Sequence, residues 1–150
     1  MIGDSKTKPM EILLVEDGLT DARVTIFAVR RSQVYHRLTL VRTVKEAIQF
    51  LNREGIFARA PKPDLLLLDM MLPDGCGLDV LEALSEWDPI NRPTTVVLTA
   101  SSDPQLLERC SQLKVHDLIS KPVHEDEFMR VVRDHKKLMI HGTQTLSSVT

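Results

Sequence analysis

The chain has 150 residues, 43% of them hydrophobic and 27% charged, and its 19 Lys and Arg nearly balance its 21 Asp and Glu. This length fits one domain that buries roughly two-thirds of its unfolded surface, while the net charge of −2 argues against nucleic-acid or membrane partners. No apolar run approaches the ~20 residues that span a bilayer, and the first residues lack the apolar core of an export signal, so we expect a cytoplasmic protein.

Three short apolar runs predict strands that are buried on both faces. They cover residues 12–15, 65–68 and 96–98, and each is stopped by a polar residue. Runs of this length, bounded by breakers, are typical of a parallel sheet. The segments 38–41 and 116–120 are weaker candidates for two further strands.

Amphipathic patterns between these runs predict five helices. At the second, Thr43 and Glu46 have the form of a capping box, in which each residue satisfies a free backbone N–H group of the other. At the fourth, Asp103 precedes a proline in the first helical position, and the fifth carries acidic residues in its first turn. The expected helices cover about 22–30, 44–54, 78–87, 104–110 and 125–139.

Strand and helix therefore alternate five times, which favours an α/β fold with an open parallel sheet, helices on both faces and right-handed crossovers. We expect one domain over residues 10–140, and disordered tails over 1–9 and 141–150. The two cysteines, Cys76 and Cys110, show no metal or redox spacing, so free thiols are expected.

Polar side chains collect where the predicted strands end. The first strand is followed by Glu16 and Asp17, the third by Asp69, the fourth by Thr99 and the fifth by Lys121. Ligands bind outside the carboxyl ends of strands in such folds. Neighbouring acids repel unless a cation is present, and Mg²⁺ takes carboxylates, waters and phosphate oxygens. A carboxylate can form an aspartyl phosphate. Asp69 is the best candidate nucleophile, because it ends the most buried predicted strand and begins a Pro/Gly-rich loop.

Each of these residues alone also has a structural explanation. The acids after the first strand can simply start a turn, Asp69 can cap a helix, and Thr99 and Lys121 can be ordinary loop residues. Their occurrence at successive strand ends is what favours a functional site. The five histidines show no ligand spacing, so His116 and His135 are expected to be packed or surface residues.

Four segments of the sequence carry a resemblance to a known family: ILLVED at 12–17, PDLLLLDMMLPDGCG at 63–77, VLTA at 97–100 and SKP at 120–122. They resemble the receiver domain of two-component response regulators, and the resemblance covers about residues 10–139. The resemblance implies a flavodoxin-like, doubly wound (βα)5 three-layer sandwich with strand order 2-1-3-4-5. A looser similarity over 51–64 is to stand-alone regulators that are paired with bacterial phytochromes.

The resemblance also implies a role for each matching residue. Asp69 would accept a phosphoryl group from a phosphohistidine of a sensor histidine kinase. Asp17 would bind Mg²⁺ directly, Glu16 through water, and Asp69 and the Met71 carbonyl would complete the protein ligands. Lys121 would pair with the phosphoryl group and Thr99 would close onto it. The remaining residues of the phosphoryl pocket would be Met70, Ala100 and Pro122, the last after a cis peptide bond.

One departure from the family pattern concerns the switch itself. Leu118 lies three residues before Lys121, where the family usually has a Tyr or Phe that switches rotamer together with the Thr. This departure puts the usual aromatic switching in doubt. The implied readout face is the fourth and fifth helices with the fifth strand, used for an unidentified downstream protein or for a homodimer.

Two other functions are weighed against the phosphorylated switch, which would not be a turnover enzyme. A Mg²⁺-dependent phosphatase would use the same nucleophile but usually needs a second acid two residues later, where this chain has Met71. A pseudo-receiver would keep the fold and bind partners without phosphate. Retention of all five polar residues at the strand ends argues against this second alternative.

Overall fold

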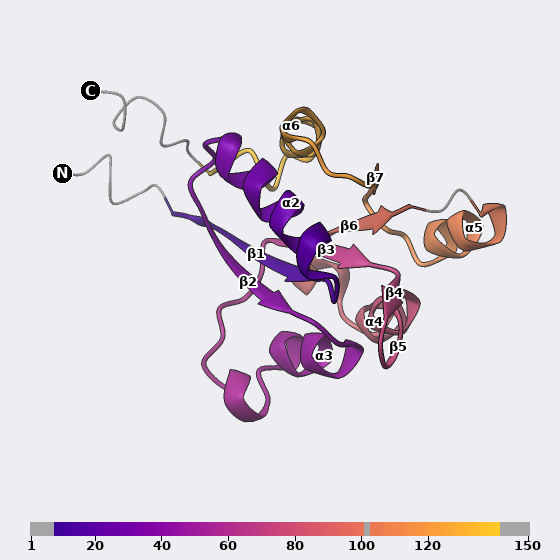
Figure 1. Ribbon diagram of the computed structural model, residues 1–150. Helices are drawn as coiled ribbons and strands as arrows, with labels where there is room; N and C mark the ends of the chain where they lie inside the picture. Colours follow the sequence, from indigo (N-terminus) through magenta and orange to yellow (C-terminus); the bar gives the residue numbers. More distant parts are fainter. Residues whose placement is uncertain (1–7, 101–102, 142–150) are drawn as a thin grey trace, which may run out of the picture.

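A computed structural model describes residues 8–100 and 103–141 (Figure 1). The tails predicted over 1–9 and 141–150 lie almost wholly outside these residues, and their predicted disorder stays a prediction. None of the helices in the described part of the chain has the length and apolar character needed to cross a membrane.

Five parallel strands form one sheet, as predicted. They are β1 (Met10–Val15), β2 (His36–Val41), β3 (Leu65–Asp69), β6 (Thr94–Thr99) and β7 (Asp117–Ser120). Their spatial order is β2-β1-β3-β6-β7. The chain between β3 and β6 also forms a separate two-stranded antiparallel hairpin, which the sequence did not predict. It consists of β4 (Met71–Leu72) and β5 (Gly75–Cys76). Counted without the hairpin, the order is 2-1-3-4-5, which confirms the flavodoxin-like fold.

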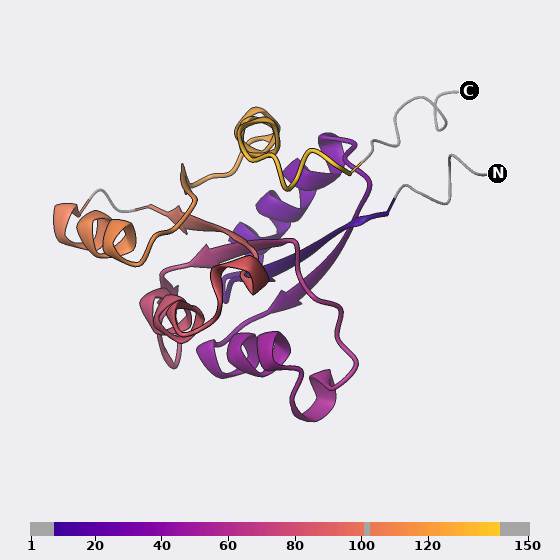
Figure 2. The ribbon, with the colours of Figure 1, turned by 180° about the vertical axis from the view of Figure 1, so that it is seen from behind.

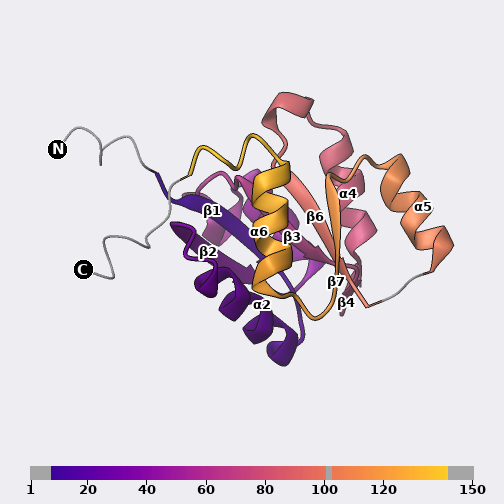
Figure 3. The same ribbon diagram turned by 90° about the horizontal axis from the view of Figure 1, so that it is seen from above.

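Helices cover both faces of the sheet, and the figures show which helix lies on which side. On one face lie α2 (Leu19–Arg31) and α6 (Glu125–Asp134); on the other lie α3 (Val44–Asn52), α4 (Gly77–Ser85) and α5 (Pro104–Gln112). Figure 2 shows the same three layers from behind, and Figure 3 shows α2 and α6 side by side. Two single-turn 3₁₀ helices, η1 (Gly55–Phe57) and η2 (Pro89–Asn91), lie in the connections.

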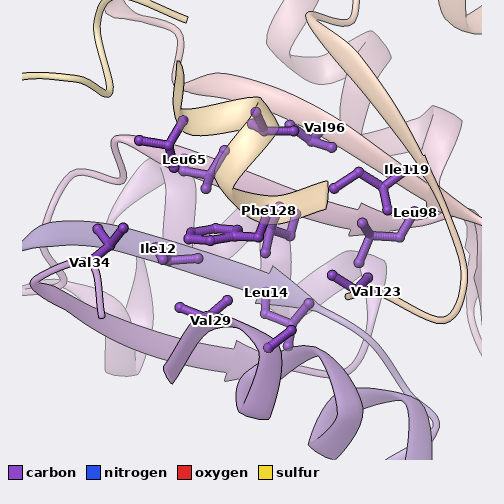
Figure 4. Close-up of a cluster of buried hydrophobic side chains, with 14 of the residues drawn as sticks. Ile12, Leu14, Val29, Val34, Leu65, Val96, Leu98, Ile119, Val123 and Phe128 are labelled. Atoms are coloured by element: carbon purple, nitrogen blue, oxygen red, sulfur yellow. The ribbon is translucent and has the colours of Figure 1, made fainter. Parts of the chain in front are cut away.

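The central strand β3 contributes to both hydrophobic cores. Because successive side chains of a strand point to opposite faces, Leu65 and Leu67 pack with α2 and α6, while Leu66 and Leu68 pack with α3 and α4. Figure 4 shows the first core around the fully buried ring of Phe128. The strand is therefore apolar on both faces, which explains its unbroken run of leucines.

Polar residues lie at both ends of this leucine run. At the amino end, the Asp64 carboxylate accepts a hydrogen bond from the backbone N–H of Glu11 at 2.9 Å. The backbone N–H of Asp64 in turn donates to the Glu11 carbonyl at 2.8 Å. At the carboxyl end, Asp69 is the last residue of β3. The strand is thus tied to β1 by polar contacts at its entry.

Two predicted helix caps are present in the structure. The Thr43 hydroxyl accepts a hydrogen bond from the Glu46 N–H at 3.0 Å, and Asp103 accepts one from Gln105 at 3.0 Å. The reciprocal half of the capping box differs, because the Glu46 carboxylate accepts from the N–H of Arg42 rather than from that of Thr43. Both caps satisfy N–H groups that the first helical turn leaves free.

The predicted last helix is too long. The amphipathic pattern extends to residue 139, but α6 ends at Asp134 and His135 has an extended conformation, with φ −119° and ψ 107°. In this conformation the His135 Nε2 lies 2.9 Å from the Asp117 carboxylate. The following turn brings the fully buried Leu138 into the core. Burial explains the apolar periodicity here without a continuous helix.

Candidate functional site

Three polar residues at the carboxyl ends of the central strands are buried. Glu16 is 2% exposed, and Asp69 and Thr99 are each 7% exposed. Isolated charges are rarely buried to this degree because losing water is costly. A counter-charge is therefore needed beside the two carboxylates.

Lys121 supplies that counter-charge. Its Nζ lies 2.7 Å from Glu16 Oε1 and 3.1 Å from Asp69 Oδ1, and its side chain is only 13% exposed. The Lys121–Pro122 peptide is cis, as the resemblance implies. The structure thus joins three of the predicted site residues, from the first, third and fifth strands of the sheet, in one buried ion cluster.

Burial dominates the electrostatics of Glu16. It raises the pKa of the Glu16 carboxyl, an effect that the neighbouring charge of Asp69 adds to and that the contact with Lys121 only partly offsets. Burial would lower the pKa of Lys121, but its contacts with Glu16 and Asp69 raise it above its usual range. The Lys121 ammonium is therefore held in its charged form, beside a Glu16 carboxylate whose charged form is destabilised by burial.

Asp17, the other predicted metal ligand of the first strand, has a different partner. Arg42, which follows β2, donates from Nη2 to the Asp17 carbonyl at 2.9 Å and to its carboxylate at 3.3 Å. Both side chains are about half exposed. Within residues 8–100 and 103–141, no group of three Asp, Glu, His or Cys side chains is arranged to hold a metal ion. In this structure the acids of the predicted ligand set are paired with Lys121 and Arg42.

The loop after Asp69 is held in place by close backbone packing. The Met70 carbonyl accepts a hydrogen bond from the Gly77 N–H at 2.8 Å. A Cβ at Gly77 would lie 2.5 Å from the Asp69 carbonyl oxygen, so only glycine allows α4 to begin this near the acid. The Met70 side chain is buried, whereas that of Met71 is 83% exposed. The predicted metal ligand at Met71 is the backbone carbonyl, so the exposed side chain is not part of the predicted ligand set.

The remaining predicted pocket residues border this cluster. The Thr99 carbonyl accepts a hydrogen bond from the Lys121 N–H at 2.9 Å, which ties β6 to the lysine. Ala100 and Pro122 are exposed, and Leu118 on β7 is 36% exposed. The alanine leaves one side of the site open to solvent.

Sequence reasoning missed three residues that contact the site or its loops. Asp21 in the first turn of α2 has Oδ2 3.2 Å from the Lys121 Nζ, and Arg42 holds Asp17 as described above. Asp74 accepts hydrogen bonds from the backbone N–H groups of Val44 at 2.8 Å and Lys45 at 3.0 Å, which lower the pKa of its carboxyl. An acid four residues after Asp17 was the available signal for Asp21; Arg42 and Asp74 gave none.

The charges of the site fit a divalent cation. Four carboxylates, those of Glu16, Asp17, Asp21 and Asp69, are paired with only two cations, Lys121 and Arg42. Among the described residues, the buried Glu16 Oε1 has no hydrogen-bond donor besides its charge contact with the lysine. Carboxylate oxygens with unmet charge are what Mg²⁺ prefers as ligands. The donor set is therefore suited to such an ion once the two basic side chains move aside.

A doubly wound sheet with acids from two neighbouring strands and a lysine after the last strand is the arrangement expected of a receiver domain. The comparison with family models assigns the same class: residues 12–133 match the response regulator receiver domain. The chain belongs to this family. The predicted resemblance is thereby confirmed over most of the sequence.

Individual relatives include regulators named for phytochromes. The chain is 30% identical over 132 residues to Response regulator Rcp1 of Synechocystis sp., covering 88% of this chain and 90% of that protein. Among solved structures, the bacteriophytochrome response regulator RtBRR aligns with TM-score 0.77 and 30% identity over 93% of this chain and 83% of that one. These matches confirm the predicted similarity to phytochrome-associated regulators.

Two further solved structures show relevant states of relatives. The phosphorylated cyanobacterial phytochrome response regulator RcpA aligns with TM-score 0.73 and 32% identity, over 85% of this chain and 91% of that one. The Mn²⁺-bound form of Rcp1 aligns with TM-score 0.72 and 28% identity, over 92% and 97%. Relatives of this fold thus include one described as phosphorylated and one described as metal-bound.

Proposed function

We propose that the protein is a phosphorylation-dependent signalling switch in which Asp69 accepts a phosphoryl group from a phosphohistidine of a sensor histidine kinase. The observation that carries this proposal is the buried Asp69 carboxylate at the end of β3, 3.1 Å from the Lys121 ammonium. The phosphorylated form of RcpA and the Mn²⁺-bound form of Rcp1 support it at the level of relatives.

The transfer needs an attacking oxygen and stabilisation of charge. An Asp69 carboxylate oxygen attacks phosphorus, the bond from phosphorus to the donor imidazole nitrogen breaks, and that nitrogen keeps the electron pair. Lys121 stays beside the new phosphoryl oxygens and offsets their charge. Thr99, at the end of the neighbouring strand β6, would donate from its hydroxyl, and the small, exposed Ala100 would leave access for the donor.

Glu16, Asp17 and Asp69, with the Met71 carbonyl, would hold Mg²⁺, Glu16 through water. The bound ion supplies Lewis-acid stabilisation of the phosphoryl oxygens. For this set to form, Arg42 must release Asp17 and Lys121 must yield Glu16 Oε1. Binding of Mg²⁺ would thus replace the contacts that Arg42 makes with Asp17 and that Lys121 makes with Glu16.

Phosphorylation then changes partner binding. It adds about −1.5 to −2 charges at the end of β3 and shifts a pre-existing equilibrium between two states. The readout face would be α5, β7 and α6, used by a downstream protein or a second copy. Leu118 lies on this face in place of the usual aromatic residue, so the face would respond without an aromatic rotamer switch.

Intact-protein mass spectrometry tests the proposal. Incubation with acetyl phosphate and Mg²⁺ should add one phosphoryl group to the wild type, and none to Asp69→Asn. Asp117→Asn is the matched control, because it removes an acid outside the site and should still be phosphorylated. Equal labelling of Asp69→Asn and wild type would contradict the assignment.

The same samples separate the alternatives. A wild type that is not labelled, yet binds partners without Mg²⁺, would be a pseudo-receiver. Steady turnover of a chromogenic phosphate ester would instead indicate a phosphatase. Neither is expected, since Met71 occupies the position of the phosphatase acid and its side chain points to solvent.

A further inference from the structure

Lys121 has a third carboxylate partner that the predicted site does not include. Asp21 Oδ2 lies 3.2 Å from the Lys121 Nζ, beside Glu16 at 2.7 Å and Asp69 at 3.1 Å. An ammonium has three N–H donors, so the three acids match its full capacity. The Asp21 side chain is 55% exposed, unlike the two buried acids.

The two oxygens of Glu16 are held differently. Oε2 accepts a hydrogen bond from the Gly18 N–H at 3.0 Å, which fixes the carboxylate at the start of the loop to α2. Oε1 is buried and lies 2.7 Å from the Lys121 ammonium, and among the described residues no other donor reaches it. Oε1 is therefore the atom that a metal-bound water would use, and Lys121 is the group that occupies it.

From this arrangement we propose that Asp21 is a positioning residue that receives the Lys121 ammonium when Mg²⁺ takes Glu16 and Asp69. This inference rests on the proposed function and adds a member to the site. Without Asp21, Lys121 would have only the two acids that the metal also needs, and ammonium and metal would compete directly for them. With Asp21, the ammonium keeps an anionic partner at the mouth of the pocket, within reach of the phosphoryl group.

The location of Asp21 favours this role over direct metal binding. It lies in the first turn of α2, whereas Glu16 and Asp17 directly follow β1. Its contact joins α2 to Lys121, 100 residues away in the sequence. Because the acid is half exposed, the ion pair adds little to folding stability, so its effect should appear in ligand binding rather than in unfolding.

A double-mutant cycle on Mg²⁺ affinity tests this coupling. Mg²⁺ is titrated into the full chain by calorimetry, without a phosphodonor. Asp21→Asn should weaken binding by about fivefold, the upper range for a partly exposed charge pair. Asp126→Asn, which removes the same charge from the exposed first turn of α6, should change affinity by less than about twofold.

The same cycle in the Lys121→Met background decides the mechanism. If Asp21 acts through the lysine, Asp21→Asn should have less than about a twofold effect there. An equal effect in both backgrounds would show that Asp21 attracts the cation directly, and would overturn the proposal, as would an unchanged affinity of the single variant. Circular dichroism and thermal unfolding verify that each variant is folded.

Phosphorylation provides the second readout. At saturating Mg²⁺, Asp21→Asn should be labelled by acetyl phosphate severalfold more slowly than wild type, while reaching the same final extent. A failure of the proposed function would instead appear as no labelling of the wild type. The two hypotheses can therefore fail separately.

Discussion

In the described part of the chain, two clusters each bring one basic side chain against several acids, and they differ in the geometry of these contacts and in the burial of the acids. In the first, Lys121 contacts Glu16, Asp69 and Asp21 at the carboxyl end of the sheet. The second is centred on Arg130 of α6. Its Nη1 and Nη2 bind the two Asp117 oxygens at 2.9 and 3.1 Å.

The Arg130 cluster is built on a two-point contact between the guanidinium and the Asp117 carboxylate. Arg130 also contacts Glu127 at 2.9 Å and Asp134 at 3.3 Å, and His135 shares the Asp117 carboxylate. Although burial would raise the pKa of Asp117, its bonds to Arg130 and His135 lower it, and the same contacts with acids raise the pKa of Arg130. Planar, two-point pairing of this kind suits a permanent structural contact.

The Lys121 cluster is the opposite case. Burial raises the pKa of Glu16 in spite of its ion pair, and a lysine makes point contacts that are easily exchanged. Perturbed groups of this kind concentrate at functional sites. The contrast teaches that an ion cluster held by single-point contacts around a destabilised buried acid is the one available to a ligand.

Breaking the Arg130 cluster should have the largest effect on stability. Arg130→Met leaves Asp117 largely buried without its two-point partner, and should lower the free energy of unfolding by about 2 kcal/mol. Urea unfolding measures this change. Arg31→Met is the control, because the Arg31–Glu125 pair is exposed and should contribute less than about 0.5 kcal/mol. A similar small loss in both variants would remove the distinction between the clusters.

Neutralising Glu16 should change Mg²⁺ affinity much more than the free energy of unfolding. Glu16→Gln keeps the shape of a side chain whose charge is costly to bury, so unfolding should change by less than about 1 kcal/mol. Mg²⁺ affinity, measured by calorimetry, should fall by about tenfold, as for other residues that hold a metal through water. A large loss of stability would show that the Lys121 cluster is structural as well.

The two clusters should respond to pH in opposite directions. The raised pKa of Glu16 means that the folded state binds its proton first, so this group favours folding increasingly as pH falls through the raised pKa towards 4.5. The lowered pKa of Asp117 gives stability that is present above 3.8 and is lost as pH falls further. Unfolding curves of wild type, Glu16→Gln and Asp117→Asn over pH 3 to 7 measure both. If both variants changed the pH dependence of stability in the same direction, the opposite pKa shifts assigned to Glu16 and Asp117 would be contradicted.

The smallest expected change in stability concerns Arg42, the basic partner of Asp17. Both side chains are about half exposed, so Arg42→Ala should change the free energy of unfolding by less than about 0.5 kcal/mol. Because Arg42 competes with the cation for Asp17, Mg²⁺ affinity should rise by about twofold. Weaker binding in this variant would mean that Arg42 supports the ligand set instead of blocking it.

The sheet and the residues at its carboxyl edge were predictable, because both follow from local patterns. Short apolar runs stopped by Glu16 and Asp69 identify buried parallel strands whatever surrounds them. The end of α6 was not predictable, since Leu138 is buried by a turn and gives the same periodicity as a helix. The pairing of Asp21 and Arg42 with site residues depends on contacts between distant segments, which no local pattern encodes.

The four consecutive leucines of β3 have a consequence for alignment within the sheet. A shift of the strand by one residue exchanges the sets that face the two helical layers, but here it would put leucine in place of leucine on both sides. Apolar packing therefore discriminates poorly between the two alignments. The two alignments are distinguished at the ends of β3, where Asp64 accepts a hydrogen bond from the backbone of Glu11 and Asp69 contacts Lys121. Asp69, the proposed phosphoacceptor, thus also helps to fix the alignment of its own strand in the sheet.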